Sequence, residues 1–140
     1  MQSRVTIIWL WVNNLEEANH FYEHIFGWKK TDASNENISF FQLNWVLLSL
    51  YSREALAEDA TVPHEWSGFK WFTLAHNMRS KQEVDDLIEE LRSKWVQIVK
   101  EPQEVFWGGY SSYITDVDDN LWEIAYNPYL EMDENGNTLC

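Results

Sequence analysis

The sequence predicts an α+β protein in which two βαβββ modules follow one another in a single domain of 140 residues. Two observations support this fold class. Short runs of β-branched and aromatic residues, which are typical of buried strands, recur along the chain. A polar cap followed three residues later by glutamate begins a helix at Asn14 (with Glu17) and again at Ser80 (with Glu83). The order of elements therefore repeats.

The first module opens with a strand at residues 5–12, an apolar run rich in Trp, Ile and Val. The helix capped by Asn14 is expected to run to about Ile25, and Gly27 ends it. "SREALAEDA" indicates a second, short helix. Three further strands are expected before it, at residues 28–32, 38–43 and 45–51, with a hairpin turn between the last two.

The second module begins with a strand at residues 70–75. Its helix carries Val84, Leu87, Ile88 and Leu91 at a spacing of three or four residues, which defines one apolar face. Three strands follow at residues 96–100, 110–115 and 121–125, and "DVDDN" is the turn before the last. The expected boundaries are about 4–55 for module one, 56–67 for the linker, 68–128 for module two, and 129–140 for a loosely ordered polar tail.

The composition and net charge limit the classes of ligand that the protein is expected to bind. Nine Trp, seven Phe and six Tyr make 16% of the chain, more than a core of this size needs, and indicate a lined cavity or an interface. The formal charge of −13 argues against binding nucleic acid or an anionic membrane and favours cationic ligands. An acidic surface that only keeps the protein in solution is the simpler alternative.

The single cysteine, Cys140, excludes an internal disulfide and a cysteine metal cluster. The apolar N-terminal run "VTIIWLWV" is too short to span a bilayer and has no small-residue cleavage site after it. We therefore expect a cytoplasmic protein.

Two segments resemble the vicinal oxygen chelate superfamily, which includes glyoxalase I, bleomycin resistance proteins, fosfomycin resistance proteins and extradiol dioxygenases. "LEEANHFYEHIFGWK" is similar to its first helix, and "YITDVDDNLWEIAYNP" is similar to its final hairpin, although Val117 and Asp119 replace the usual Pro and Gly of the turn. The resemblance implies a half-barrel cavity built by the two βαβββ modules, and usually a homodimer.

The resemblance also places the superfamily's four metal ligands on the inner strands. The corresponding residues here are Ile7, Ser49 (Leu48 if the register shifts by one), Trp71 and Glu123. One carboxylate with Ile, Ser and Trp does not provide the three or four N or O ligands that a divalent ion needs. We therefore expect no cofactor and no metal. A divalent metal is the disfavoured alternative, and Glu123 becomes a candidate catalytic acid or base whose pKa rises if it is buried without a cation.

Strand alternation extends this assignment along each strand. If Ile7, Ser49 and Trp71 face the cavity, as the resemblance implies, alternation turns Trp9, Trp11, Trp45 and Thr73 toward it as well, and the resemblance places Glu123 on the same side. "VFWGGYSSY" borders the cavity in the resembling family. The expected ligand-binding residues are thus Trp9, Trp11, Trp45, Ser49, Trp71, Thr73, Trp107, Tyr110 and Tyr113. Aromatics that fill the sheet or meet a dimer partner remain the alternative.

The functional prediction is a small-molecule binding protein of this superfamily without a metal, whose ligand is cationic or aromatic, as in bleomycin resistance proteins. The alternatives are a metal-dependent lyase resembling glyoxalase I and a binder of an unknown metabolite. His20-Phe21-Tyr22-Glu23-His24 also fits the H-x-x-E-H zinc signature of a metalloprotease. A helical wheel turns both histidines away from the apolar face, so we expect no protease and only a fortuitous surface zinc site as the alternative.

Overall fold

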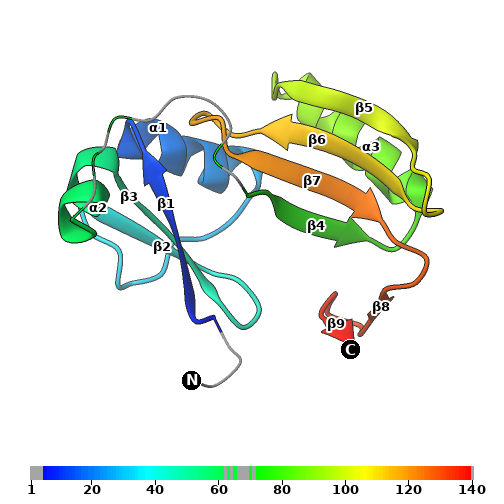
Figure 1. Cartoon of the computed structure of the whole chain (residues 1–140), viewed down its shortest axis with the longest axis horizontal. Helices are drawn as coiled ribbons and strands as arrows, with labels where there is room; N and C mark the ends of the chain where they lie inside the picture. The colour runs from blue at the N-terminus through cyan, green and yellow to red at the C-terminus, as the bar shows by residue number, and fades with distance from the viewer. Residues whose placement is uncertain (1–4, 62, 64, 66–69, 71, 140) are drawn as a thin grey trace. The chain divides into compact units, whose positions relative to one another are not determined.

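The computed structural model describes residues 5–61, 63, 65, 70 and 72–139 (Figure 1). Contacts divide the chain into two compact units, Met1–Gly68 and Phe69–Cys140, and each is described by itself. Both units combine one mixed β-sheet with a helix against it, which confirms the α+β class. Among the described helices none is both long enough and apolar enough to cross a membrane.

The first unit contains a three-stranded sheet in the order β1-β3-β2, in which β1 and β3 are parallel and β2 and β3 form an antiparallel hairpin. Its elements are β1 (Ile7–Val12), α1 (Leu15–His20), the π-helical turn η1 (Phe21–Ile25), β2 (Ile38–Gln42), β3 (Leu47–Ser52) and α2 (Arg53–Asp59).

Helix α1 begins where the sequence predicts. The side chain of Asn14 accepts hydrogen bonds from the backbone N–H groups of Glu16 (2.9 Å) and Glu17 (3.1 Å), which would otherwise lack partners in the first helical turn. Gly27 follows the helix with a φ of +72°, a conformation that glycine adopts without strain. The face of α1 and η1 opposite the two histidines is apolar and buried, through Ala18, Phe21 and Tyr22.

The strand expected at residues 28–32 was wrong. This segment makes only an isolated bridge between Lys30 and Phe41, and the N–H of Thr31 donates to the carbonyl oxygen of Phe40 (2.8 Å). One bridge does not continue into a ladder, so the described residues of the first unit form one strand fewer than a full βαβββ module. The short helix after β3 is confirmed, and Ser52 caps it by accepting from the N–H of Ala55 (3.2 Å).

The second unit contains the complete βαβββ order. Its four-stranded sheet runs β4-β7-β6-β5, with β4 parallel to β7 and the other neighbours antiparallel. Figure 1 shows helix α3 lying along one face of this sheet, which it contacts through Val84, Ile88 and Leu91. The elements are β4 (Leu74–Met78), α3 (Lys81–Ser93), β5 (Ile98–Glu104), β6 (Tyr110–Thr115), β7 (Leu121–Tyr126), β8 (Glu131–Met132) and β9 (Thr138–Leu139).

Strand β4 begins four residues after the start of the predicted strand at 70–75. Its position is set by parallel pairing with β7, in which Leu74 is opposite Trp122 and Met78 is opposite Tyr126. Lys70 lies before the strand, and its ammonium donates to the carbonyl oxygen of Asp118 (2.6 Å) and to Oδ1 of Asn120 (2.8 Å). Apolar patterning alone did not reveal this side-chain anchor.

The C-terminal tail was predicted to be loosely ordered, and this was wrong for its described part. Strands β8 and β9 pair as a small antiparallel hairpin. Its turn, residues 133–137, is held by Asp133, whose Oδ1 accepts the backbone N–H groups of Asn135 (2.9 Å) and Asn137 (2.8 Å). The hydrogen bonds from Asn137 are the main cause that lowers the pKa of the Asp133 carboxyl.

The turn before β7, residues 116–120, has the same construction. Oδ1 of Asp116 accepts the backbone N–H groups of Asp118 (2.9 Å) and Asn120 (2.9 Å), and Oδ2 accepts the Asn120 amide (2.7 Å). The fourth residue has a positive φ in both turns, +60° at Asp119 and +81° at Gly136. The predicted turn at "DVDDN" is therefore confirmed, and the tail repeats its geometry.

Candidate functional site

The sheet of the second unit has one face against α3 and one face turned away from it. Pairing across β7, β6 and β5 places Glu123 opposite Tyr113, and Tyr113 opposite Lys100. Ser111 lies on the same face, two residues before Tyr113. We call the face that carries Lys100, Ser111, Tyr113 and Glu123 the Tyr113 face.

Tyr113 is the centre of this group. Its hydroxyl donates a hydrogen bond to the Glu123 carboxylate and is also hydrogen-bonded to the Thr73 side chain. Burial raises the pKa of the Tyr113 phenol, and the charge of Glu123 and the hydrogen bond to it raise it further, while the Thr73 hydrogen bond acts in the opposite direction. The structure thus joins three residues that the sequence predicted separately.

Lys100 approaches the same tyrosine from β5. Its ammonium lies 5.4 Å from the centre of the Tyr113 ring, within cation–π range, and donates to Oγ of Ser111 (2.9 Å). The Lys100 carbonyl oxygen accepts from Oγ of Ser112 (2.6 Å), which fixes its backbone. The Tyr113 face therefore carries a carboxylate, two hydroxyls and an ammonium around one aromatic ring.

The sheet of the first unit has an aromatic face on the side away from α1. Trp9, Ser49 and Phe40 are neighbours across β1, β3 and β2. The Trp9 ring lies 6.0 Å from the rings of both Phe40 and Tyr51. We call the face that carries Trp9, Trp11, Phe40, Ser49 and Tyr51 the Trp9 face.

Ser49 is fully buried beneath these rings, and its hydroxyl has no hydrogen-bond partner among the described residues. The strand pairing decides the register of β3, because Ser49 is opposite Trp9 and Phe40. Leu48 lies on the opposite face, next to Phe41, which contacts Tyr22 of η1. At the end of β1, the guanidinium of Arg53 lies 4.6 Å from the centre of the Trp11 ring, a cation–π contact.

Residues 4–124 match the model of the Glyoxalase/Bleomycin resistance protein/Dioxygenase superfamily. The chain belongs to this superfamily. The structure of a glyoxalase-related enzyme from Fulvimarina pelagi is 32% identical, with 99% of each chain covered and a TM-score of 0.88. This likeness extends over the whole chain, including the tail.

More distant superfamily members share the fold. A lactoylglutathione lyase from Agrobacterium tumefaciens is 20% identical, with 91% of this chain and 96% of that chain covered and a TM-score of 0.71. The genomically encoded fosfomycin resistance protein FosX from Listeria monocytogenes is 22% identical, with 92% and 97% covered and the same TM-score. At these identities the likeness concerns the fold alone.

Several predicted site residues of this superfamily member lie elsewhere. Trp45 lies in the turn between β2 and β3, 84% exposed, because β3 begins two residues after the predicted start. Tyr110 lies on the α3 face, where its hydroxyl donates to Oδ1 of Asp85 (2.8 Å). Trp107 lies in the β5–β6 loop with its ring against Gly109, so closely that a Cβ there would lie 1.9 Å from it. Trp71 lies outside the described residues.

Phe40, Lys100 and Arg53 are the site residues that sequence reasoning missed. The hairpin turn between β2 and β3 carried a usable signal for Phe40, because pairing the two strands about that turn puts Phe40 opposite Ser49. Lys100 had no such signal, since two register shifts in the β5–β6 pairing decide where it lies.

The described residues at the superfamily's metal-ligand positions offer few donor atoms in this structure. Ile7 offers no donor atom, Ser49 is covered by aromatic rings, and Glu123 accepts from Tyr113. In the part of the chain that the structure describes, no group of three or more His, Cys, Asp or Glu side chains is placed to hold a metal ion. One accessible carboxylate is not a donor set for a divalent cation.

The H-x-x-E-H segment occupies the last residue of α1 and the turn η1. His20 and His24 are exposed, as predicted, and their rings stack at 4.5 Å with an angle of 14° between planes. The lone pairs of an imidazole lie in the ring plane, so two nearly parallel rings do not direct them at one ion. The pair as arranged is not a zinc site.

Proposed function

We propose that this superfamily member binds a small organic cation at the Tyr113 face and does so without a metal ion. The observation that supports this is the Tyr113 hydroxyl hydrogen-bonded to the Glu123 carboxylate on a sheet face. That pair offers a cation both a negative charge and an aromatic ring, and each cation–π contact contributes about 0.5–2 kcal/mol. The protein's net charge of −13 adds a long-range attraction for cations.

Lys100 bears on this proposal because it places a positive charge on the same face. Its ammonium is engaged by Ser111 and by the Tyr113 ring, so its charge is partly balanced where it lies. A ligand that also carries a hydrogen-bond acceptor would meet Lys100 with that group and Glu123 with its cationic group. The proposed ligand class is therefore a small cation with at least one acceptor atom.

The residues of the Trp9 face give separate support for an aromatic ligand. Trp9 is 42% exposed although it lies on a sheet, and it contacts two further rings. The guanidinium of Arg53 already makes a cation–π contact with Trp11 on this face. Both sheets thus offer the aromatic chemistry that planar organic cations use.

Isothermal titration with planar cationic compounds, bleomycin-type compounds among them, tests the proposal. Glu123→Gln should weaken binding about tenfold, the loss of roughly 1.4 kcal/mol of charge interaction. Glu134→Gln is the matched control, because it removes the same charge from an exposed residue of the tail hairpin. Equal effects of the two variants, or no binding at high micromolar concentration, would contradict the proposed site.

A metal-dependent lyase is the second candidate, favoured by Glu123 at the last ligand position and by the fold shared with the lactoylglutathione lyase. Metal analysis of the purified protein separates the two. About one equivalent of Zn, Ni, Mn or Fe that is lost in Glu123→Gln would support the lyase. Less than roughly a tenth of an equivalent would contradict the three or four ligands such a site needs.

A further inference from the structure

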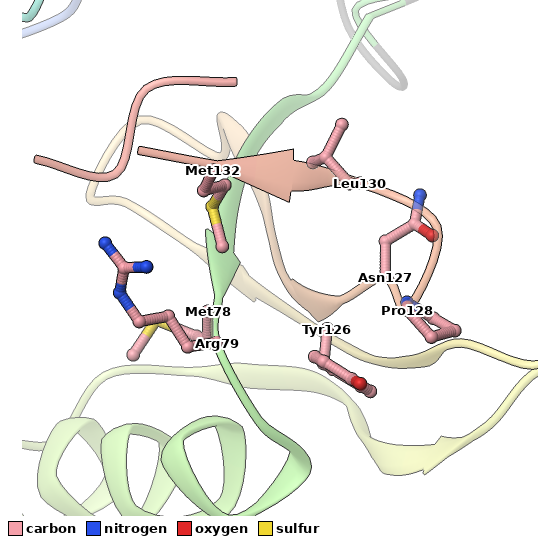
Figure 2. A pocket seen from close by; sticks show the side chains of 7 residues that line it. All are labelled: Met78, Arg79, Tyr126, Asn127, Pro128, Leu130 and Met132. Carbon is pink, nitrogen blue, oxygen red and sulfur yellow. The ribbon is translucent and has the colours of Figure 1, made fainter. Parts of the chain in front are cut away.

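A pocket of about 220 Å³ lies in the second unit where the parallel strands β4 and β7 end. None of its residues belongs to the Tyr113 face. Figure 2 shows Arg79 on one side of the pocket and Asn127 and Pro128 on the other, with Met132 and Tyr126 between them. The lining residues are Met78, Arg79, Tyr126, Asn127, Pro128, Leu130 and Met132.

Hydrogen bonds hold the walls of this pocket. Met78 and Tyr126 are neighbours in the β4–β7 pairing and form the base. After β7, Oδ1 of Asn127 accepts from the N–H of Tyr129 (2.9 Å), and the N–H of Leu130 donates to the Asn127 carbonyl oxygen (3.2 Å). This turn leads the chain back into β8, which carries Met132. The pocket is therefore a product of the ordered tail.

Arg79 supplies the charged group. One guanidinium nitrogen donates to the carbonyl oxygen of Asp133 (2.5 Å), which fixes the side chain. Within the described residues no carboxylate lies at ion-pair distance from this guanidinium, unlike that of Arg92. A guanidinium has five N–H donors in a planar fork, so donors remain for an anion.

The other side chains favour a ring. The thioethers of Met78 and Met132 adapt to irregular apolar shapes and contact aromatic rings favourably, and Tyr126 provides an aromatic wall. The pocket is open to solvent, and its volume of about 220 Å³ is enough for one ring with a substituent of carboxylate size.

We propose that this pocket binds a monocyclic aromatic carboxylate, with the ring against Met78, Met132 and Tyr126 and the carboxylate on Arg79. The acidic surroundings oppose this charge. In the tail, the Asp133 carboxylate accepts from Asn137 and Asn135, and the charge of Arg79 also helps to lower its pKa, so it competes with an anion for Arg79. Because the net charge of −13 remains, the affinity should be weak, with a Kd on the order of 1 mM.

Methionine methyl NMR with benzoate tests the proposal on the full chain. The chain has three methionines, of which Met78 and Met132 line the pocket. We expect the methyl resonances of these two residues to shift with one common Kd. No shift of the pocket pair up to roughly 10 mM benzoate, well above that weak Kd, would overturn the proposal.

Charge dependence is tested in two independent ways. Arg79→Gln should weaken benzoate binding about tenfold, whereas Arg92→Gln, which removes the same charge from helix α3, should change it less than about twofold. With the unaltered chain, neutral benzamide should bind more weakly than benzoate. Equal affinity for the two compounds would overturn the assignment of the carboxylate to Arg79, even if Arg79→Gln disturbs the tail. Glu123→Gln should leave benzoate binding unchanged, which separates this pocket from the Tyr113 face.

Discussion

Removing the Tyr113 hydroxyl with Tyr113→Phe tests the arrangement on which the proposed function depends. Phenylalanine keeps the ring and therefore the cation–π contact with Lys100, but it removes the hydrogen bond to Glu123. A hydrogen bond to a charged group contributes about 1.5–3 kcal/mol when buried, and partial exposure of both residues reduces this to about 1 kcal/mol. The free energy of unfolding should fall by that amount near neutral pH.

The pH dependence gives a second readout with a defined sign. The folded-state pKa of Tyr113 is raised above its ordinary value of 10.0, so the folded state holds this proton more tightly than the unfolded state. The stability that the proton contributes is complete below the unfolded pKa and is lost as pH rises through the folded pKa. The stability difference between the native protein and Tyr113→Phe should therefore shrink above about pH 10.

Urea unfolding followed by tryptophan fluorescence, at about pH 7 and then up to about pH 11, measures both effects. Tyr129→Phe is the matched control, since Tyr129 is 78% exposed and, within the described part of the chain, it is the backbone N–H rather than the hydroxyl that is hydrogen-bonded. A double-mutant cycle with Glu123→Gln should give a coupling of about 1 kcal/mol. Coupling below about 0.5 kcal/mol, the usual error of additivity, would refute the hydrogen bond as the source of the effect.

Three further predictions concern other parts of the chain. Ser49→Ala should raise the free energy of unfolding by about 1 kcal/mol, because the buried hydroxyl has no hydrogen-bond partner among the described residues. Ser112→Ala, at an equally buried serine bonded to the Lys100 carbonyl, should lower it by about the same amount. Changes of the same sign in urea unfolding would count against this reasoning. Trp95→Gly should raise the free energy of unfolding by about 0.5–1 kcal/mol, because Trp95 follows α3 with a φ of +63° and its side chain is 95% exposed. A lower melting temperature of the variant would contradict that reasoning. Light scattering should give a homodimer of about 33 kDa, twice the 16.7 kDa chain, and a mass near 17 kDa at micromolar concentration would exclude it.

The features predicted well from sequence were those with a local cause. Asn14 and Ser80 cap helices because side-chain oxygens bond to nearby N–H groups, and such bonds depend only on neighbours in the chain. Strand alternation likewise placed Trp9 on the face of β1 away from α1, while Ser49 and Glu123 were placed by the family resemblance.

The features that were missed depend on pairing between distant segments. The β4–β7 register moved the predicted strand at 70–75 toward the C-terminus, and bulges in β5 decided that Lys100 would meet Tyr113. Tyr110 and Tyr113 are three residues apart on one strand, so they lie on opposite faces, and only the position of α3 says which face is covered. Such placements follow from the tertiary structure and leave no local signal in the sequence.

The two turns at 116–120 and 133–137 show which of their residues matter when turn sequences are compared between proteins. "DVDDN" and "DENGN" share only their first and last letters, yet the same carboxylate and amide hydrogen bonds close both. The two ends therefore specify the geometry, and the middle residues need only tolerate it, as Asp119 does at φ +60°. Val117 and Asp119, which replace the usual Pro and Gly, therefore leave the hydrogen bonds between Asp116 and Asn120 unchanged. A search for this turn should weight Asp116 and Asn120 above the three letters that they enclose.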